Sequence, residues 1–92
     1  MEREIVHLPE KNRFETVQDE LTSYIRYTPF KGGINIISTY VPEELEGQGI
    51  ASVLTRHVLE YAREHHLKVI PTCGFTIVYL RRHPEYGVLV VE

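Results

Sequence analysis

Two glycines, Gly47 and Gly49, lie between an alternating apolar run at residues 34–41 and a long stretch of helical spacing that begins near Ile50. A helix N-terminus carries unpaired backbone N–H groups and a partial positive charge, and glycines let an anion approach them closely. A strand, a glycine turn and a helix start in this order therefore predict a binding site for a phosphorylated ligand. The Gly-x-Gly pair alone would be weak evidence, because it also occurs in ordinary turns.

Cys73 is the single cysteine of the chain and the second candidate for chemistry. It follows a predicted strand and precedes a predicted short helix, a place where the helix N-terminus can stabilise a thiolate. A nucleophilic role is one interpretation of this position. The other, which is the more common role of a free cysteine, is that of a small buried hydrophobic residue.

Composition restricts the class of protein. The chain has 92 residues, 42% hydrophobic and 25% charged, which fits one globular domain over residues 1–92. Ten Lys and Arg against 13 Asp and Glu give a net charge of -3, which argues against a nucleic-acid-binding protein. One cysteine excludes an internal disulfide and favours a reducing compartment. No apolar run approaches a membrane span and no signal segment is evident, so we expect a cytoplasmic protein without a membrane partner.

The first half of the chain predicts four short strands separated by tight turns. The strands are expected at residues 4–8, 13–17, 21–27 and 34–41, and the turns at 9–12, 18–20 and 29–33. Connections this short join antiparallel neighbours, so these strands should form a meander. In the fourth strand, simple alternation places Ile34, Ile36, Ser38 and Tyr40 on one face and Asn35, Ile37, Thr39 and Val41 on the other.

The second half predicts a long helix at 48–66, a strand at 67–72, a short helix at 75–83 and a last strand at 87–91. The apolar residues of the long helix recur at helical spacing. They are Ile50, Val53, Leu54, Val58, Tyr61 and Ala62. A helix between two strands makes a right-handed crossover, so strand 67–72 should run parallel to strand 34–41. Pro71 lacks an N–H, and the two strands are therefore expected to separate there.

Three segments occur within this order of elements: Glu-Gly-Gln-Gly-Ile-Ala at 46–51, Val-Ile-Pro-Thr-Cys at 69–73 and His-Pro-Glu-Tyr at 83–86. With them, the chain resembles the GNAT superfamily of N-acetyltransferases. More narrowly, it is similar to the small single-domain YjdJ-type members. The likeness runs from about Arg13 onward. It implies an α+β fold with a mixed sheet. This GNAT-like fold has an N-terminal antiparallel meander, one long crossover helix, a splayed central pair of parallel strands, and a short C-terminal helix and strand.

The resemblance also implies how acetyl-CoA would bind. The pyrophosphate would rest on the glycine turn, and the thioester carbonyl would meet a backbone N–H near Tyr40 or Val41. The residues so assigned to the coenzyme are Tyr40, Val41, Gly47, Gln48, Gly49, Ile50, Ala51 and Ser52. The Ser52 hydroxyl could donate to a phosphate oxygen or simply face water.

The chain departs from the family pattern in three places. Glu46 stands where the family carries a basic or amide residue, and Ser38-Thr39 stands where small members carry His-Thr. Larger members insert two helices between the first and second strands, whereas here only residues 9–12 fill that gap. We therefore expect an open acceptor side, suited to an exposed amine on a large molecule or to a small amine held by a partner subunit.

Acetyl transfer to an amine needs a neutral amine, a polarised carbonyl and a proton for the departing thiolate, but no covalent nucleophile. Cys73 could still accept the acetyl group. Tyr79 corresponds in position to the family's tyrosine acid, and a place in the core explains it equally well. His83 is better explained as a cation at a helix C-terminus than as a base. No metal is proposed, because His65, His66, Cys73 and His83 lack a ligand spacing.

Two functions from different classes are open at this point. The preferred one is an acetyl-CoA-dependent N-acetyltransferase whose amine acceptor the sequence does not identify. The alternative is a non-catalytic module that binds acyl-CoA or a nucleotide in the same cleft, suggested by Glu46, Ser38 and the missing acceptor wall. The sequence does not predict the oligomeric state.

Overall fold

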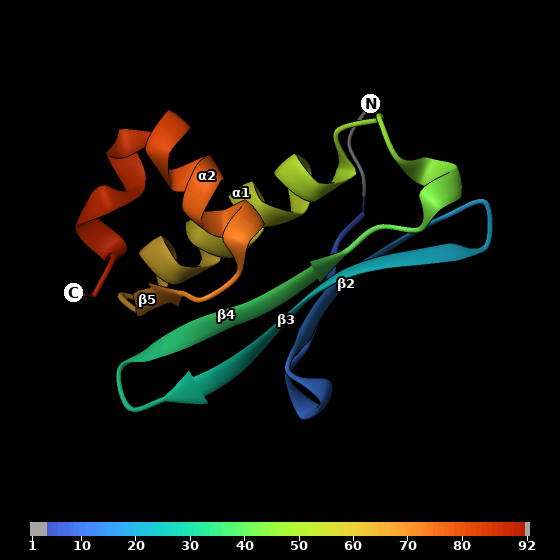
Figure 1. Ribbon diagram of the computed structural model, residues 1–92. Helices are drawn as coiled ribbons and strands as arrows, with labels where there is room; N and C mark the ends of the chain where they lie inside the picture. Colours follow the sequence, from blue (N-terminus) through green and yellow to red (C-terminus); the bar gives the residue numbers. More distant parts are fainter. Residues whose placement is uncertain (1–3, 92) are drawn as a thin grey trace.

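A computed structural model describes residues 4–91 and shows one five-stranded sheet covered on one side by two helices (Figure 1). The strands are β1 (Val6–Leu8), β2 (Arg13–Gln18), β3 (Leu21–Phe30), β4 (Gly33–Tyr40) and β5 (Lys68–Pro71), and they lie in this order across the sheet. The helices are α1 (Ile50–Glu64) and α2 (Gly74–Arg82), and the 3₁₀ turns are η1 (Pro9–Lys11), η2 (Glu43–Leu45) and η3 (Pro84–Leu89). Strands β1 to β4 pair antiparallel, and β4 and β5 pair parallel. The mixed α+β fold predicted from the sequence is confirmed.

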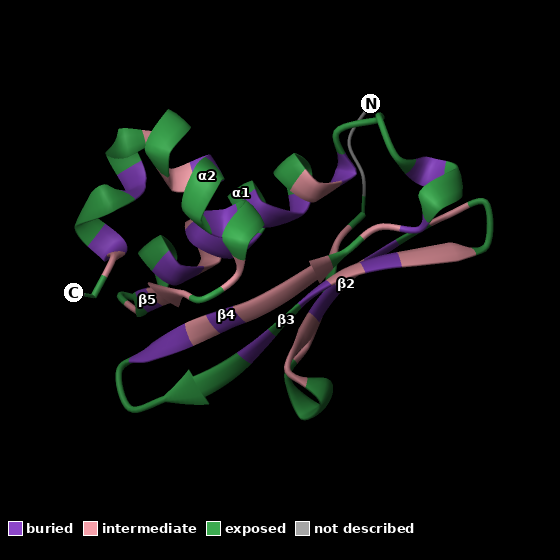
Figure 2. Ribbon diagram, viewed as in Figure 1, coloured by how far each residue is buried: buried purple, intermediate pink, exposed green. Residues whose placement is uncertain are grey.

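The core lies between α1 and the sheet face that α1 covers. Phe14, Ile25 and Ile36 project from the strands and are fully buried against Leu54 and Val58 of the helix. Figure 2 shows buried positions along α1 and the strands, while the turn between β3 and β4 is exposed. Helical spacing predicted this packing, with differences in detail.

Three positions of α1 differ from the prediction. Val53 is 41% exposed, whereas Thr55 and Leu59 are fully buried. Thr55 is tolerated inside because its hydroxyl donates to the Ala51 carbonyl at 2.8 Å. Val53 instead lines a cavity together with Tyr79 of α2. No helix among the described residues 4–91 is long and apolar enough to cross a membrane.

Strand β4 contains a register shift that corrects the predicted faces. Arg26 pairs with Ser38 and Tyr27 pairs with Ile36, so Ile37 has no partner on β3. An extra residue of this kind reverses the alternation beyond it. Thr39 therefore lies opposite buried Ile25 on the helix side, and Tyr40 lies opposite Tyr24 on the far side. The prediction that Ile34, Ile36, Ser38 and Tyr40 share one face is wrong.

The parallel pair of β4 and β5 is short. Its register ends with Ile36 opposite Pro71, and the N–H groups of Thr72 and Cys73 both donate to the Ile36 carbonyl, at 3.1 and 2.9 Å. Strand β4 then continues to Tyr40 without β5 beside it. The edge of β4 beyond Pro71 is therefore unpaired on the β5 side. The Ile36 carbonyl points to this side, and the register shift at Ile37 reverses the alternation, so the N–H groups of Thr39 and Val41 also point to it.

The predicted last strand at 87–91 is wrong. Residues 84–89 form the 3₁₀ turn η3, and a single bridge joins Val90 to Val69, with the Val91 N–H donating to the Val69 carbonyl at 3.0 Å. Tyr86 and Leu89 are buried and lie three residues apart, which is the period of a 3₁₀ helix, while Val88 is 76% exposed. The apolar composition around Val88 is typical of a strand and led to the prediction. The burial of Tyr86 and Leu89, however, follows a period of three residues and not two.

Candidate functional site

A cavity of about 550 Å³ opens where β4 ends and α1 begins. Its volume is within the range of small-molecule sites. It is bordered by one continuous stretch, from the end of β4 through η2 and the glycine turn to the first turn of α1, and by Phe75 at the start of α2. The lining residues are Thr39, Tyr40, Val41, Leu45, Glu46, Gly47, Gly49, Ala51, Ser52 and Phe75.

The glycine turn leaves the start of α1 open. Gly47 and Gly49 have φ of 87° and 78°, a conformation that favours glycine, and a Cβ on either would meet no atom within 4 Å. No side chain among the described residues caps the helix, and its first backbone bond runs from the Val53 N–H to the Gly49 carbonyl. The N–H groups of the first turn are thus available to an anion, which fits the pyrophosphate of a coenzyme.

The structure brings six of the eight residues assigned to the coenzyme to this cavity: Tyr40, Val41, Gly47, Gly49, Ala51 and Ser52. The side chains of the other two point elsewhere. Gln48 is exposed and accepts a hydrogen bond from Gln18 Nε2 at 2.8 Å, and Ile50 is buried in the core. We therefore expect these two residues to meet a ligand through their main-chain N–H groups and not through their side chains.

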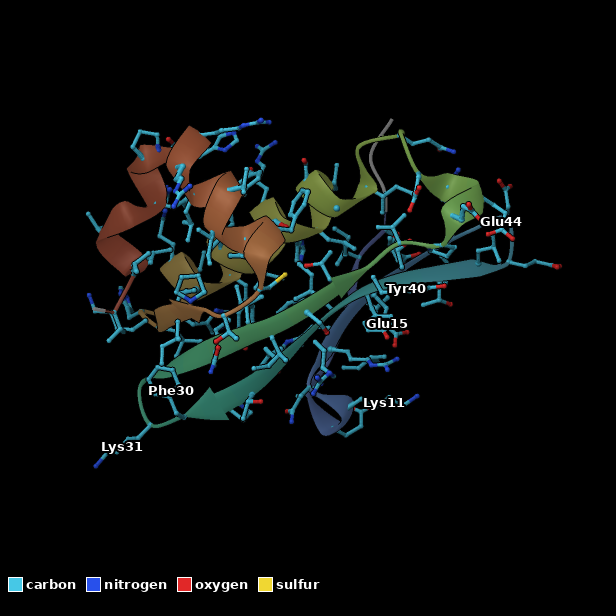
Figure 3. All side chains as sticks on the ribbon, viewed as in Figure 1. Lys11, Glu15, Phe30, Lys31, Tyr40 and Glu44 are labelled. Carbon is cyan, nitrogen blue, oxygen red and sulfur yellow. The ribbon has the colours of Figure 1, made fainter. Side chains whose placement is uncertain are left out.

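Tyr40 borders the cavity but directs its ring away from the helices. Figure 3 shows the labelled Tyr40 and Glu15 side chains below the sheet, on the face opposite α1 and α2. There the Tyr40 ring lies 5.4 Å from the ring of Tyr24, and Arg13 lies over the Tyr24 ring at 3.9 Å. We therefore expect the main chain of Tyr40, rather than its ring, to face a ligand.

Cys73 is the N-cap residue of α2 and is partly buried. Its Sγ lies 3.5 Å from Oγ1 of Thr39, which lines the cavity. Burial raises the pKa of the Cys73 thiol, but hydrogen bonds from the Thr39 hydroxyl and from the N–H groups of Thr76 and Phe75 outweigh it, so this pKa lies below the ordinary value. A thiolate at this position is stabilised by its surroundings.

Tyr79 lies on the buried side of α2 and lines a second cavity, formed with α1 and η3. Its ring stacks on His83 at 4.0 Å, and His83 Nδ1 hydrogen-bonds the Tyr79 carbonyl at 2.9 Å. Burial raises the pKa of the Tyr79 hydroxyl. His83 thus caps the end of α2, as the structural interpretation of this residue expects.

Four residues that line the cavity were not assigned to the coenzyme from the sequence: Thr39, Leu45, Glu46 and Phe75. Thr39 was placed on the wrong face because nothing in the sequence marks the register shift at Ile37. Phe75 is 40% exposed and borders the cavity. Its position two residues after Cys73 was the available signal.

Comparison with known proteins gives two results. A family model described as GCN5-related N-acetyl-transferase matches residues 13–89, which include the glycine turn and Cys73. Among solved structures, the chain is similar to a GCN5-like candidate N-acetyltransferase from Staphylococcus aureus, determined by solution NMR. That similarity has 34% sequence identity and a TM-score of 0.75, and it covers 96% of this chain and 87% of that chain.

Proposed function

Because this chain belongs to the GCN5-related N-acetyltransferase family, we propose that it transfers an acetyl group from acetyl-CoA to an amine. The observation that carries the proposal is the uncapped N-terminus of α1, which opens into the same cavity as the end of β4. One end of that cavity suits a diphosphate and the other reaches Cys73 through Thr39. The narrower likeness to YjdJ-type members stays a prediction.

The coenzyme would be held mainly by main-chain groups. The N–H groups from Gly47 to Ser52 would bind the pyrophosphate, and the unpaired edge of β4 at Thr39 and Val41 would bind the acetyl-bearing arm. Glu46 borders the cavity but is exposed, so solvent screens its repulsion of a phosphate. Fixed amide donors need no rearrangement when charge develops on a bound carbonyl oxygen.

Cys73 is proposed as the first acetyl acceptor. Its thiolate would attack the carbonyl carbon of the thioester, form a new C–S bond and release the coenzyme as a thiolate, which takes up a proton. A neutral amine would then attack the acetyl group on Cys73, lose a proton and restore the Cys73 thiolate. Tyr79, which lines the neighbouring second cavity, is the proposed proton donor to the coenzyme thiolate, because a tyrosine hydroxyl carries a proton at neutral pH.

The acceptor side of the molecule is open. Between β1 and β2 the chain has only η1 and Asn12, so no helix is inserted there to enclose an amine. We propose that the acceptor is an exposed amine on a large molecule, whose surface covers the open side, or a small amine enclosed by a partner subunit.

Calorimetry with coenzyme A, followed by a thiol-release assay with acetyl-CoA and a panel of amines, tests the function. Binding together with amine-dependent release is expected. Binding without release from any amine would indicate a non-catalytic acyl-CoA-binding module, and absence of binding would contradict both functions.

Gly49→Glu tests the cradle itself. The substitution places bulk and negative charge where the pyrophosphate is expected, so it should abolish coenzyme binding. Gly32→Glu is the matched control, because Gly32 also has a positive φ, of 90°, and open space around it, but lies in the turn between β3 and β4. Equal loss of binding in both variants would attribute the effect to backbone strain and would contradict the proposed cradle.

Cys73→Ala tests the covalent step. We expect loss of acetyl labelling of the protein and a large loss of turnover, measured by mass spectrometry and by thiol release, with coenzyme binding retained. Near-normal turnover in the variant would show that the amine attacks acetyl-CoA directly and that Cys73 is structural.

A further inference from the structure

The sheet face opposite α1 and α2, which we call the uncovered face, carries two arginines in one row (Figure 1). Arg13 of β2 pairs with Arg26 of β3, and Arg26 pairs with Ser38 of β4. Residues directly opposite one another on neighbouring strands project to the same face of the sheet. That face is the uncovered one, because Arg26 is exposed while Ile25 and Tyr27 beside it are buried on the helix side.

Arg26 is the member of this row whose charge is not neutralised within the described chain. The Arg13 guanidinium lies 3.3 Å from the Glu15 carboxylate and 3.9 Å from the centre of the Tyr24 ring. Neither ion pair formed within residues 4–91 includes Arg26. Like charges directly opposite each other on a sheet repel. An anion supplied by another molecule would therefore be stabilised beside Arg26.

Arg26 lies one strand away from the edge of β4 at which we expect the acetyl group. Its partner Ser38 directly precedes Thr39, and the Thr39 hydroxyl lies 3.5 Å from the Cys73 sulfur on the helix side. Strand β5 has already ended at this level, so this edge of β4 is unpaired. A molecule on the uncovered face would therefore reach the cavity around this edge, about 5 Å, one strand spacing, from β3.

The charges along β4 differ on the two sides of this position. Residues 43–46, which follow the strand, include three glutamates, and Figure 3 shows the labelled Glu44 beyond Tyr40. Arg26 lies on the other side of Tyr40, toward the start of the strand. An acidic group on an acceptor is therefore attracted to the Arg26 side of the reacting position and repelled from the glutamate side.

We infer that Arg26 selects an acceptor lysine that has an acidic residue close to it in a polypeptide. The inference rests on the proposed function and names the acceptor class. Arg26 borders neither the coenzyme cavity nor the cavity beside it, and a position outside a concave site suits a macromolecule better than a small molecule. A guanidinium binds a carboxylate through paired, charge-assisted hydrogen bonds. Tyr40 is 49% exposed, with its ring on the same face, and offers a surface to the methylene stem of the lysine.

Acetylation of three blocked pentapeptides with one central lysine tests this inference. Two glutamates precede the lysine in the first and follow it in the second, and the remaining positions, with all four of the third, are glutamine. Wild type should use the better acidic peptide with a kcat/KM about threefold above that of the glutamine peptide. The net charge of -3 would by itself favour the opposite order, so such a preference requires a local contact.

Variants assign the preference to one side chain. Arg26→Gln should abolish it, and Arg26→Lys, which keeps the charge, should retain most of it. Arg81→Gln is the matched control, because it removes the same charge from an exposed position on α2 and should behave as wild type. Coenzyme A binding, measured by calorimetry, should be the same in all four proteins, which separates a loss of acceptor selectivity from a loss of folding.

Several results would overturn the inference. Wild type could use the glutamine peptide as well as both acidic ones, or the preference could persist in Arg26→Gln. An equal loss of preference in Arg81→Gln would assign the effect to net charge. Acetylation of small amines but of none of the peptides would also overturn the inference and leave the proposed function standing, whereas absence of thiol release with every amine would overturn both.

Discussion

The Thr39 hydroxyl and the Cys73 sulfur form a hydrogen bond of 3.5 Å that joins β4 to the start of α2 at the site. The contact depends on two local features. The register shift at Ile37 turns Thr39 toward the helices, and the end of β5 at Pro71 brings Cys73 beside it. The reactivity of the thiol is thus set by strand geometry as well as by the helix start.

Thr39→Val should raise the pKa of Cys73. The hydroxyl lowers this pKa by hydrogen bonding to the thiolate, and valine keeps the shape while removing the donor. The pH dependence of alkylation by iodoacetamide should therefore shift to higher pH, with the protein still folded. Thr72→Val is the control, because its hydroxyl bonds Asn35 Oδ1 at 2.5 Å instead. An unchanged alkylation midpoint in Thr39→Val would contradict the assignment.

At this level the sequence identified the glycine turn and Cys73 but not the partner of Cys73. The predicted strand before Gly47 and Gly49 and the predicted helix after them allowed both glycines to be placed at the start of that helix. Thr39 could not, because a register shift arises from how β3 and β4 pair and not from the residues of β4 alone.

Among the elements, the parallel pair of β4 and β5 depends on a close approach at Gly33. A Cβ at this residue would overlap the carbonyl of Lys68, which is main chain, and the ring of Phe30 at 2.5 Å. Gly33 pairs with Lys68 on β5 and with Phe30 on β3, so a Cβ at Gly33 cannot move away from one of these neighbours without approaching the other. The start of the crossover strand is therefore fixed by the absence of a side chain.

Gly33→Ala should lower the free energy of unfolding by about 1–3 kcal/mol, the usual cost of overpacking. Urea denaturation followed by circular dichroism measures it. Gly74→Ala should be neutral or stabilising by up to about 1 kcal/mol, since Gly74 begins α2 with ordinary φ and no atom within 4 Å of its Cβ. A Gly33→Ala variant as stable as wild type would show that β5 can shift against β4, and would contradict the fixed close approach at Gly33.

The long elements could be predicted and the last one could not. Helix α1 has enough turns for its apolar period to be unambiguous. A strand, a helix and a parallel strand are then joined by a right-handed crossover. The six residues 84–89 form a run too short for its sequence to distinguish a period of two from a period of three. Their conformation is decided by contacts made elsewhere, since Tyr86 reaches Glu60 on α1.

Taken whole, the molecule has one core, and we propose that residues 1–92 fold as one domain. The radius of gyration is 12.5 Å, close to the about 12 Å expected for a compact domain of this length. The N-terminal strands are tied to α1 by stacked rings at the edge of the core. His7 stacks on Phe14 at 4.0 Å and meets the edge of Tyr61 at 4.8 Å, and its Nε2 lies 2.6 Å from the Tyr27 hydroxyl.

His7 should make the stability of the whole molecule depend on pH. Burial lowers its pKa from 6.5, the charges of His57 and His65 on α1 lower it further, and Glu10 on η1 partly opposes them. The unfolded chain therefore takes up a proton at His7 near pH 6.5, before the folded protein does, and stability falls as the pH drops below that value. Thermal unfolding at about pH 7.5 and about pH 5 should show a smaller loss of Tm for His7→Gln than for wild type. His66→Asn removes an exposed imidazole with no ring contact within residues 4–91 and should leave the loss unchanged. An equal loss in His7→Gln and wild type would mean that the carboxylates, and not this ring cluster, control the acid sensitivity of the fold.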